Sequence, residues 1–230
     1  MTLNLSKPIL YLITRGATVE ATKPESEEFQ NVLRQVSAAV TAGIQLIQIR
    51  EKQLTTRVLF ELTARVVAIA RGSSTRVLVN DRADIAASAG ADGVHLTTRS
   101  LTPDVIRKTF GANFLIGAST HSLTEAQAAC REGAYFAVFG PIFPSLSPSP
   151  PKGKHGPALG AAPLIEATRE LAPFPLLALG GISIENVNEC LSAGASGIAG
   201  ITLFGEPHAL AKTVETIREL AKTEVRRVAS

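Results

Sequence analysis

Polar and charged side chains follow several short apolar runs of this sequence at strand-like spacing. In the segment QIREK, Gln48, Arg50 and Lys52 stand two residues apart, so in a strand all three point to one face. Cations on a buried face are unfavourable unless anions face them. The pattern therefore indicates either an internal layer of salt bridges that includes Glu51 or a site that binds a phosphate-bearing ligand.

The segment VNDR supplies an amide and a carboxylate after the next apolar run. Asn80 is suited to hydrogen-bond a polar ligand, and Asp81 offers the hard oxygen ligand that binds Mg²⁺ together with substrate phosphates. As an alternative, Asp81 caps a helix that starts near Arg82. His95 in GVHL likewise has two interpretations, a hydrogen-bonded histidine of the core or a ligand contact.

Three later segments offer groups that bind anions. In GASTHS, the hydroxyl of Ser119 can donate a hydrogen bond to an anion. The loop that starts with FGPIFPS has about 20 residues, and its Lys152 and Lys154 either close over a diphosphate or stay solvated. In LGGI, Gly180 and Gly181 leave backbone N–H groups bare for a phosphate.

A repeated phrase indicates which elements carry these residues. Four segments consist of a helix end, a glycine and a short apolar strand, with Gly43, Gly90, Gly133 and Gly194 at the junctions. Glycine closes a helix in the left-handed conformation, and the apolar run that follows suits a buried parallel strand. Apolar residues at three- and four-residue spacing between these phrases indicate helices. The chain therefore alternates strand and helix.

Eight strands are predicted in this way, at residues 8–14, 44–50, 76–80, 93–96, 114–118, 135–140, 176–180 and 197–202. Eight such units in 230 residues predict one α/β domain over residues 1–230, a single (β/α)8 TIM barrel, in which functional residues follow the strands. An open, doubly wound sheet is the alternative, but no G-x-G-x-x-G follows the first strand. The last helix is predicted over about 206–228, and the region 206–230 ends in a basic tail.

Composition narrows the class of protein further. Apolar residues make up 45% of the chain, enough for a large core, and 23 basic against 20 acidic side chains leave a net charge of only +3. With no Trp and two Tyr, the chain lacks the aromatic side chains of a single-strand nucleic-acid binder. Prolines and glycines break its longest uncharged runs, and no export signal is evident. We expect a cytoplasmic protein that acts on small molecules, without nucleic-acid or membrane partners.

Two features concern packing and assembly. Cys130 and Cys190 have neither metal-ligand spacing nor the density of a disulfide scaffold, so both are expected to be reduced core residues. The apolar positions of the first helix and Phe204 could serve an interface that joins copies of the chain into a homo-oligomer.

Taken in order, the segments QIREK, VNDR, ADGVH, IGAS, FGPIFPS and LGGI resemble the thiamine phosphate synthase and TenI superfamily over essentially the whole chain. The resemblance implies a transferase of thiamine biosynthesis that joins an aminopyrimidine methyl diphosphate to a thiazole phosphate. In such an enzyme, Mg²⁺ sits on the diphosphate, the diphosphate leaves first, and the thiazole nitrogen traps the pyrimidine cation.

The resemblance also assigns roles to residues of this chain. Those that line the pyrimidine are Gln48, Asn80 and His95. Those that hold the diphosphate are Arg50, Lys52 and Ser119, with Asp81 on Mg²⁺. Those that bind the thiazole phosphate are Ser145, Ser147, Gly181, Ile201 and Thr202. The phosphate-binding Gly180 and the loop lysines Lys152 and Lys154 complete the predicted substrate contacts.

Three positions depart from the synthase pattern. Ser100 stands where the G-Q-x-D motif carries a second metal-binding carboxylate, which implies a weakened Mg²⁺ site. Pro148 stands where the Thr-x-Thr-Lys loop carries its lysine, so Lys152 or Lys154 would have to replace it. Pro141 occupies the position of a histidine that serves the related TenI-type thiazole tautomerase.

The departures leave more than one activity open. Coupling is favoured because Lys52, Asn80 and Asp81 have no purpose in a site that never holds a diphosphate. A TenI-type thiazole tautomerase, an isomerase, would need a proton-transfer residue such as His95 or His155. A non-catalytic, regulatory barrel that binds thiamine phosphates would keep the phosphate loops and lose the metal. A tryptophan-pathway barrel with similar phosphate loops is the least favoured choice.

Overall fold

Strands and helices alternate in the computed structural model, which describes residues 5–145 and 157–229, and the side chains up to residue 223. The eight strands are β1 (Ile9–Ile13), β2 (Leu46–Ile49), β3 (Arg76–Asn80), β4 (Gly93–Leu96), β5 (Leu115–Thr120), β6 (Phe136–Phe139), β7 (Leu176–Ala178) and β8 (Gly197–Gly200). The helices that follow them are α1 (Glu27–Thr41), α2 (Thr56–Ala70), α3 (Ala83–Ser88), α4 (Pro103–Phe110), α5 (Leu123–Arg131), α6 (Ala161–Leu171), α7 (Val187–Ser192) and α8 (Leu210–Ala229).

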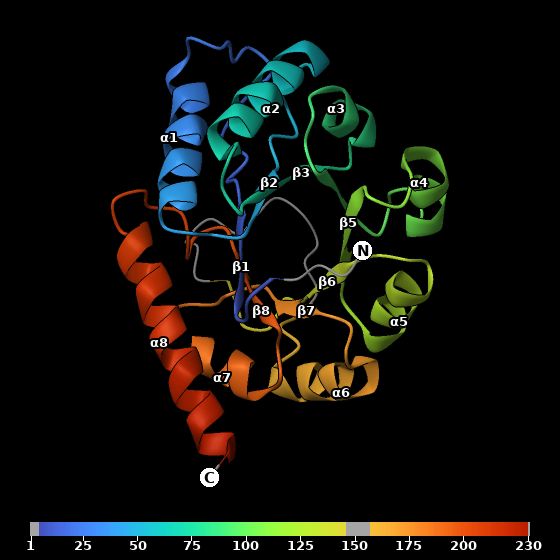
Figure 1. Ribbon diagram of the computed structural model, residues 1–230, viewed down its shortest axis with the longest axis vertical. Helices are drawn as coiled ribbons and strands as arrows, with labels where there is room; N and C mark the ends of the chain where they lie inside the picture. Colours follow the sequence, from blue (N-terminus) through green and yellow to red (C-terminus); the bar gives the residue numbers. More distant parts are fainter. Residues whose placement is uncertain (1–4, 146–156, 230) are drawn as a thin grey trace.

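All eight strands are parallel and close into one barrel in chain order, with β8 beside β1. Figure 1 shows the helices arranged around these strands, with α8 extending beyond the barrel toward the C-terminus. The predicted (β/α)8 barrel is therefore confirmed. Because the strands are parallel, all eight C-terminal ends meet at one rim, and the loops that follow them lie side by side there.

Two apolar layers hold the barrel. One lies between the strands and the helices and includes Val36, Leu62 and Leu164. The other fills the barrel interior with side chains such as Tyr11 and Phe136, both fully buried. Strands that bury both faces must consist of nearly continuous apolar residues, which is why the apolar runs predicted them.

Local signals place the element ends. The four predicted junction glycines all have the positive φ of a helix terminus, between 75° and 92°. Five strands, β1, β2, β6, β7 and β8, stop one or two residues earlier than predicted. The pairing of β2 with β3 ceases at Ile49, and that of β8 with β1 at Gly200. The last helix begins at Leu210 rather than near residue 206, because residues 206–209 form a turn.

Two packing expectations were wrong. Phe204 is fully buried and belongs to the core between strands and helices, and its carbonyl accepts a hydrogen bond of 3.0 Å from Gln35 Nε2. It cannot serve an interface between copies. Cys190 is buried as expected, but Cys130 is only half-buried; both thiols are free.

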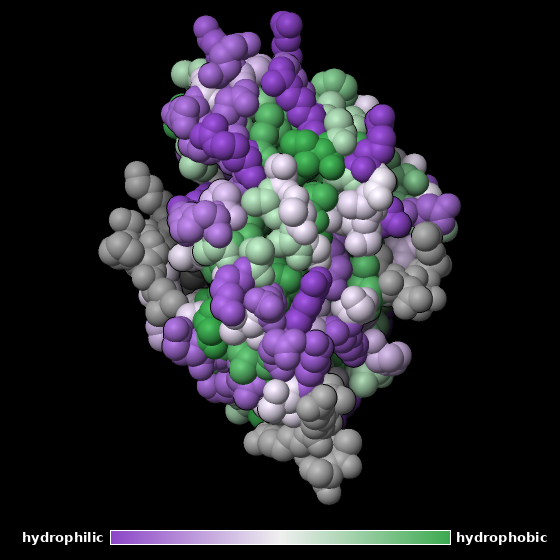
Figure 2. All heavy atoms as spheres, turned by 60° about the vertical axis from the view of Figure 1, so that its left-hand side comes forward, coloured by the Kyte–Doolittle hydropathy of each residue, from purple (hydrophilic) through white to green (hydrophobic). Residues whose placement is uncertain are grey.

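The outer surface mixes residue types. Figure 2, which brings the side of α1 and α8 forward, shows hydrophobic residues interleaved with hydrophilic ones over this face. No described helix is long and apolar enough to cross a membrane.

Candidate active site

The candidate residues lie on adjacent strands at the C-terminal rim. Strand register sets Ile13 beside Gln48, and Asn80 beside His95. Ser119 follows on β5, next to β4. The barrel therefore brings residues from five neighbouring strands, β1 to β5, to one part of the rim.

Gln48 and Asn80 form an amide pair inside this rim. The Gln48 side chain is 1% exposed, and its Nε2 donates to Asn80 Oδ1 over 3.0 Å. Its Oε1 is buried without a hydrogen-bond partner among the described residues. A buried acceptor that lacks a hydrogen bond costs about 1–3 kcal/mol, so this oxygen is suited to accept a hydrogen bond from a ligand.

Asp81 adopts an unusual backbone conformation directly after β3. Its φ of 59° makes it the one residue other than glycine with positive φ in the described part of the chain. Its N–H donates to the carbonyl of His95 over 2.9 Å, which ties the end of β3 to β4. A positive φ costs a residue with a side chain about 1 kcal/mol. The hydrogen bond to His95 offsets this cost and thereby holds the exposed carboxylate of Asp81 at the rim.

The alternative role of Asp81 as a helix cap is wrong. Helix α3 begins at Ala83, its N-terminal flanking residue is Arg82, and no side chain caps it. The guanidinium of Arg82 pairs with Asp84 at 2.7 Å rather than with Asp81. No described residue hydrogen-bonds the Asp81 carboxylate, which leaves its oxygens accessible to a cation.

The cations of QIREK lie beyond the strand rather than on one of its faces. β2 ends at Ile49, so of these three side chains Gln48 lies within the strand, while Arg50 is half-buried and Lys52 exposed in the loop. Strand alternation cannot continue where pairing ends, which is why the predicted common face was wrong for Lys52.

Glu51 does not form the internal layer of salt bridges. It is 2% exposed and points toward the loop after β1, where it accepts hydrogen bonds from Gly16 N (3.0 Å), Thr18 N (3.2 Å) and Thr18 Oγ1 (2.7 Å). Across residues 5–145 and 157–223, no carboxylate forms an ion pair with Arg50 or Lys52. The two cations therefore remain for an anion.

A further cation, Arg99, lies near this group and was not singled out from the sequence. Partial burial lowers the pKa of the Lys52 ammonium, the charges of Arg50 and Arg99 lower this pKa further, and the charge of Asp81 raises it. Lys52 is therefore within electrostatic reach of both arginines and of the carboxylate. The sequence did carry a signal for Arg99: the segment TTRS follows the fourth strand directly, just as the cations of QIREK follow the second strand.

His95 is a hydrogen-bonded residue of the barrel interior. It is 2% exposed; one hydrogen bond of 3.1 Å joins its Nδ1 to the Tyr11 hydroxyl, and another of 2.9 Å joins its Nε2 to Ser119 Oγ. Burial lowers the pKa of the ring to about 3, so the imidazole is neutral. A Cβ at Gly117 would lie 2.7 Å from Nδ1, so only glycine leaves room for the ring here. The geometry favours the core interpretation and makes His95 an orienting group for the half-buried Ser119.

The loops after β6 and β7 are in close contact. Phe143 N donates to Gly180 O over 3.0 Å, and a Cβ at Gly181 would lie 2.2 Å from Pro144 O. With φ of 102° and 60°, both glycines take conformations that L side chains disfavour. Because these glycines have no side chains, the loop of residues 141–145 can approach them closely. The sequence alone did not predict this use of the two glycines.

Backbone donors remain at this second part of the rim. The Asn186 side chain fixes the turn by donating to Gly181 O over 2.9 Å and accepting from Ser183 N over 2.8 Å. The N–H groups of Gly181 and Ile201 donate to no other described residue. Thr202 follows β8 and is exposed, as is Ser145 on the neighbouring loop. The predicted residues Ser147, Lys152 and Lys154, and also His155, lie outside the described residues.

The described residues provide few ligands for a metal ion. Residues 5–145 and 157–223 hold no group of three or more His, Cys, Asp or Glu side chains that could bind one. The Ser100 side chain hydrogen-bonds within its own turn: its Oγ accepts from Thr97 N over 2.7 Å and shares a hydrogen bond of 3.0 Å with Thr97 Oγ1. The accessible carboxylate of Asp81 nevertheless fits Mg²⁺, provided that substrate phosphates complete the coordination, because Mg²⁺ is usually held by one or two carboxylates with phosphates and water.

Comparisons with known proteins agree with this geometry. The family model described as thiamine monophosphate synthase matches residues 10–204. The chain belongs to this family. Among the thiamine monophosphate synthase relatives, the thiamine-phosphate synthase of Anaeromyxobacter dehalogenans is 39% identical over 191 residues, 82% of this chain and 83% of the relative. That of Roseiflexus castenholzii is 31% identical over 210 residues, 91% and 90% of the two chains.

Solved structures of two proteins share the barrel fold, and one of them also agrees with the family assignment. A thiamine phosphate pyrophosphorylase from Pyrococcus furiosus superposes with a TM-score of 0.73 at 28% identity and covers 94% of this chain and 96% of the other. A structure titled native KDPGal, at 20% identity and a TM-score of 0.70, covers 98% of this chain and all of its own, and shows the fold alone.

Proposed function

We propose that this chain is a transferase that couples an aminopyrimidine methyl diphosphate to a thiazole phosphate and releases diphosphate. The observation that carries the proposal is the rim between β2 and β4, where Arg50 and Lys52 have no described carboxylate partner and Asp81 is held beside them. Membership of the thiamine monophosphate synthase family supports the same activity.

The amide pair is suited to the pyrimidine. An aminopyrimidine carries an exocyclic amino group that donates hydrogen bonds and ring nitrogens that accept them. The orphaned Oε1 of Gln48 would accept from the amino group, and the half-buried Asn80 would bind beside it. This contact would satisfy the one buried polar side-chain atom that lacks a partner in the described chain.

The cations are suited to the leaving diphosphate. When the bond between the methylene carbon and the diphosphate oxygen breaks, its electron pair leaves with the oxygen, and negative charge grows on the diphosphate. Arg50 and Lys52 would stabilise that charge, and the Ser119 hydroxyl, oriented by His95, would hydrogen-bond a phosphate oxygen. Mg²⁺ bound through Asp81 would supply further positive charge on the same phosphates.

No proton acceptor is needed for the coupling step. The lone pair of the thiazole nitrogen forms the new carbon–nitrogen bond to the pyrimidine cation, and no proton moves in that step. The thiazole phosphate would bind at the rim of β6 to β8. The residues proposed there are Ser145, Ser147, Gly180, Gly181, Ile201 and Thr202, whereas Lys152 and Lys154 would close over the diphosphate.

The site offers little support to a tautomerase. Such an isomerase must move a proton, and His95, a candidate for that step, is buried between Tyr11 and Ser119 with its pKa lowered to about 3. A base with so low a pKa is a weak proton acceptor near neutral pH. A regulatory barrel would bind phosphates without needing Asp81. A cytoplasmic location, a homo-oligomer and the absence of nucleic-acid partners stay predictions.

A product assay tests the proposal. The full chain is supplied with both substrates, with and without Mg²⁺, and thiamine phosphate and diphosphate are measured. We expect turnover that Mg²⁺ stimulates, and we expect Asp81→Asn to raise the Mg²⁺ concentration for half-maximal rate about tenfold or more. Asp84→Asn is the matched control, because that carboxylate is exposed nearby but pairs with Arg82. Retained phosphate binding without product would contradict the proposal and favour a binding protein.

A further inference from the structure

Arg99 occupies the tip of a self-contained turn after β4. Ser100 Oγ accepts from Thr97 N over 2.7 Å, and Arg99 N donates to Thr97 Oγ1 over 3.3 Å. The turn therefore satisfies its own polar groups. Because β4 pairs with β3 and Asp81 N–H is bonded to His95 O, this tip is set next to the loop that carries Asp81.

The side chain of Arg99 has no ion-pair partner among the described residues. Most other described arginines are engaged: Arg15, Arg34, Arg65, Arg76, Arg82 and Arg169 pair with carboxylates, and Arg107 and Arg218 donate to carbonyls. The segment 146–156 contains no acidic residue that could pair with Arg99.

Three cations and one carboxylate thus meet at the rim of β2 to β4. Lys52 lies close enough to the other three for their charges to change its pKa: Arg50 and Arg99 lower this pKa, and Asp81 raises it. Like charges held together without a counter-ion are unfavourable, and the closed barrel keeps them together. The surplus of positive charge matches a small, highly charged anion.

We infer that Arg99 binds the diphosphate directly, as a third cation beside Arg50 and Lys52, so that the diphosphate binds without Mg²⁺. The inference rests on the proposed function and adds a residue and a metal-independent mode of binding to it. A guanidinium is suited to the task because it donates two parallel hydrogen bonds to a phosphate and is always charged.

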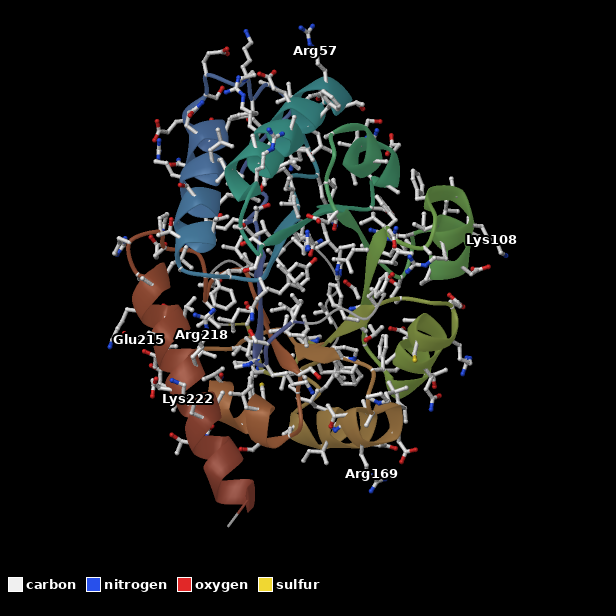
Figure 3. The ribbon with its side chains drawn as sticks, in the orientation of Figure 1. Arg57, Lys108, Arg169, Glu215, Arg218 and Lys222 are labelled. Atoms are coloured by element: carbon white, nitrogen blue, oxygen red, sulfur yellow. The ribbon has the colours of Figure 1, made fainter. Side chains whose placement is uncertain are left out.

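The test is calorimetric titration of the full chain with inorganic diphosphate, in EDTA and in Mg²⁺. We expect the unmodified protein to bind in EDTA, and Arg99→Ala to bind about tenfold more weakly there. Arg99→Lys should retain an intermediate affinity, because it keeps the charge and loses the paired donors. Arg169→Ala is the matched control, since this exposed arginine points away from the barrel on α6 (Figure 3).

The outcomes separate this inference from the proposed function. Equal diphosphate affinity of Arg99→Ala and the unmodified protein in EDTA would overturn the inference, as would binding that occurs only with Mg²⁺, even if thiamine phosphate is formed. Loss of binding in Arg99→Ala, with no product from the unmodified enzyme, would support the inference and contradict the coupling activity. Arg99→Lys guards against a folding defect, because it changes only the shape of an exposed cation.

Discussion

The two halves of the barrel rim differ in the groups that they present to a phosphate-bearing ligand. The half from β2 to β5 presents side-chain charge: Arg50, Lys52 and Arg99, with Asp81 among them. The half from β6 to β8 presents backbone, because Gly180 and Gly181 bring two loops together and leave N–H groups at the surface. Charge suits a leaving group whose negative charge grows during the reaction, whereas a shaped backbone suits a phosphate that is only held.

The difference predicts different consequences of substitution. On the charged half, a changed side chain should alter the rate and leave the fold intact, because the cations are not buried in the core. On the backbone half, a changed residue should disturb the fold and the binding of one substrate together.

Removal of charge should have the largest effect. Arg50→Ala should lower kcat by about 100-fold or more, because preorganised charge stabilises the leaving diphosphate. Steady-state kinetics and a melting curve would check this, with Arg57→Ala as the control, since Arg57 is exposed on α2 and points away from the barrel (Figure 3). If Arg50→Ala instead lowers stability and leaves kcat unchanged, the assignment of charge to catalysis on this half is wrong.

A side chain at Gly181 should destabilise the fold by about 3 kcal/mol. Gly181→Val must adopt a φ of 60° and place its Cβ 2.2 Å from Pro144 O, so the two loops must separate. Urea unfolding measures the loss, and the KM for thiazole phosphate should rise more than that for the pyrimidine diphosphate. Gly72→Val is the control, because Gly72 also has positive φ but has open space around it. Equal losses in the two variants would remove the case for close loop contact.

Gln48→Leu should separate stability from binding. It removes the orphaned Oε1, which favours folding, and the Nε2 donor to Asn80, which opposes it, so the free energy of unfolding should change by less than about 1 kcal/mol. The KM for the pyrimidine diphosphate should rise about tenfold. Gln53→Leu, an exposed position on the following loop, serves as the control. An unchanged KM for the pyrimidine diphosphate would show that the amide pair does not hold the pyrimidine.

The smallest expected effect is the pH dependence of stability from His95. Its folded pKa of about 3 is below the value of about 6.5 in the unfolded chain, so between these values the unfolded state binds more protons. Stability should therefore fall as pH falls below about 6.5, by about 1 kcal/mol between pH 6 and pH 5.

Urea unfolding at pH 7, 6 and 5 measures this slope. His95→Gln should flatten it, whereas His121→Gln should not, because His121 is exposed and pairs with Glu125 on the surface. An unchanged slope in His95→Gln would mean that the ring is not held neutral by its burial beneath the charged half of the rim.

Local patterns in the sequence determined the fold and the position of the site. The alternation of apolar strands and helices, with a glycine at each of four junctions, depends on neighbouring residues only, and it predicted all eight strands. It also placed Gln48, Asn80 and His95 at strand ends. Parallel strands must share one rim, so the common location of these residues followed before any contact was known.

Contacts between strands were decided by the tertiary structure alone. The hydrogen bond of Glu51 to Thr18, that of Asp81 N–H to His95 and the proximity of Arg99 to Lys52 join residues far apart in the chain. The burial of the unpartnered Gln48 oxygen likewise depends on the closed barrel. A polar side chain after a strand has several partners within reach. Which partner the side chain contacts depends on the register and closure of the whole barrel, and the neighbouring sequence determines neither.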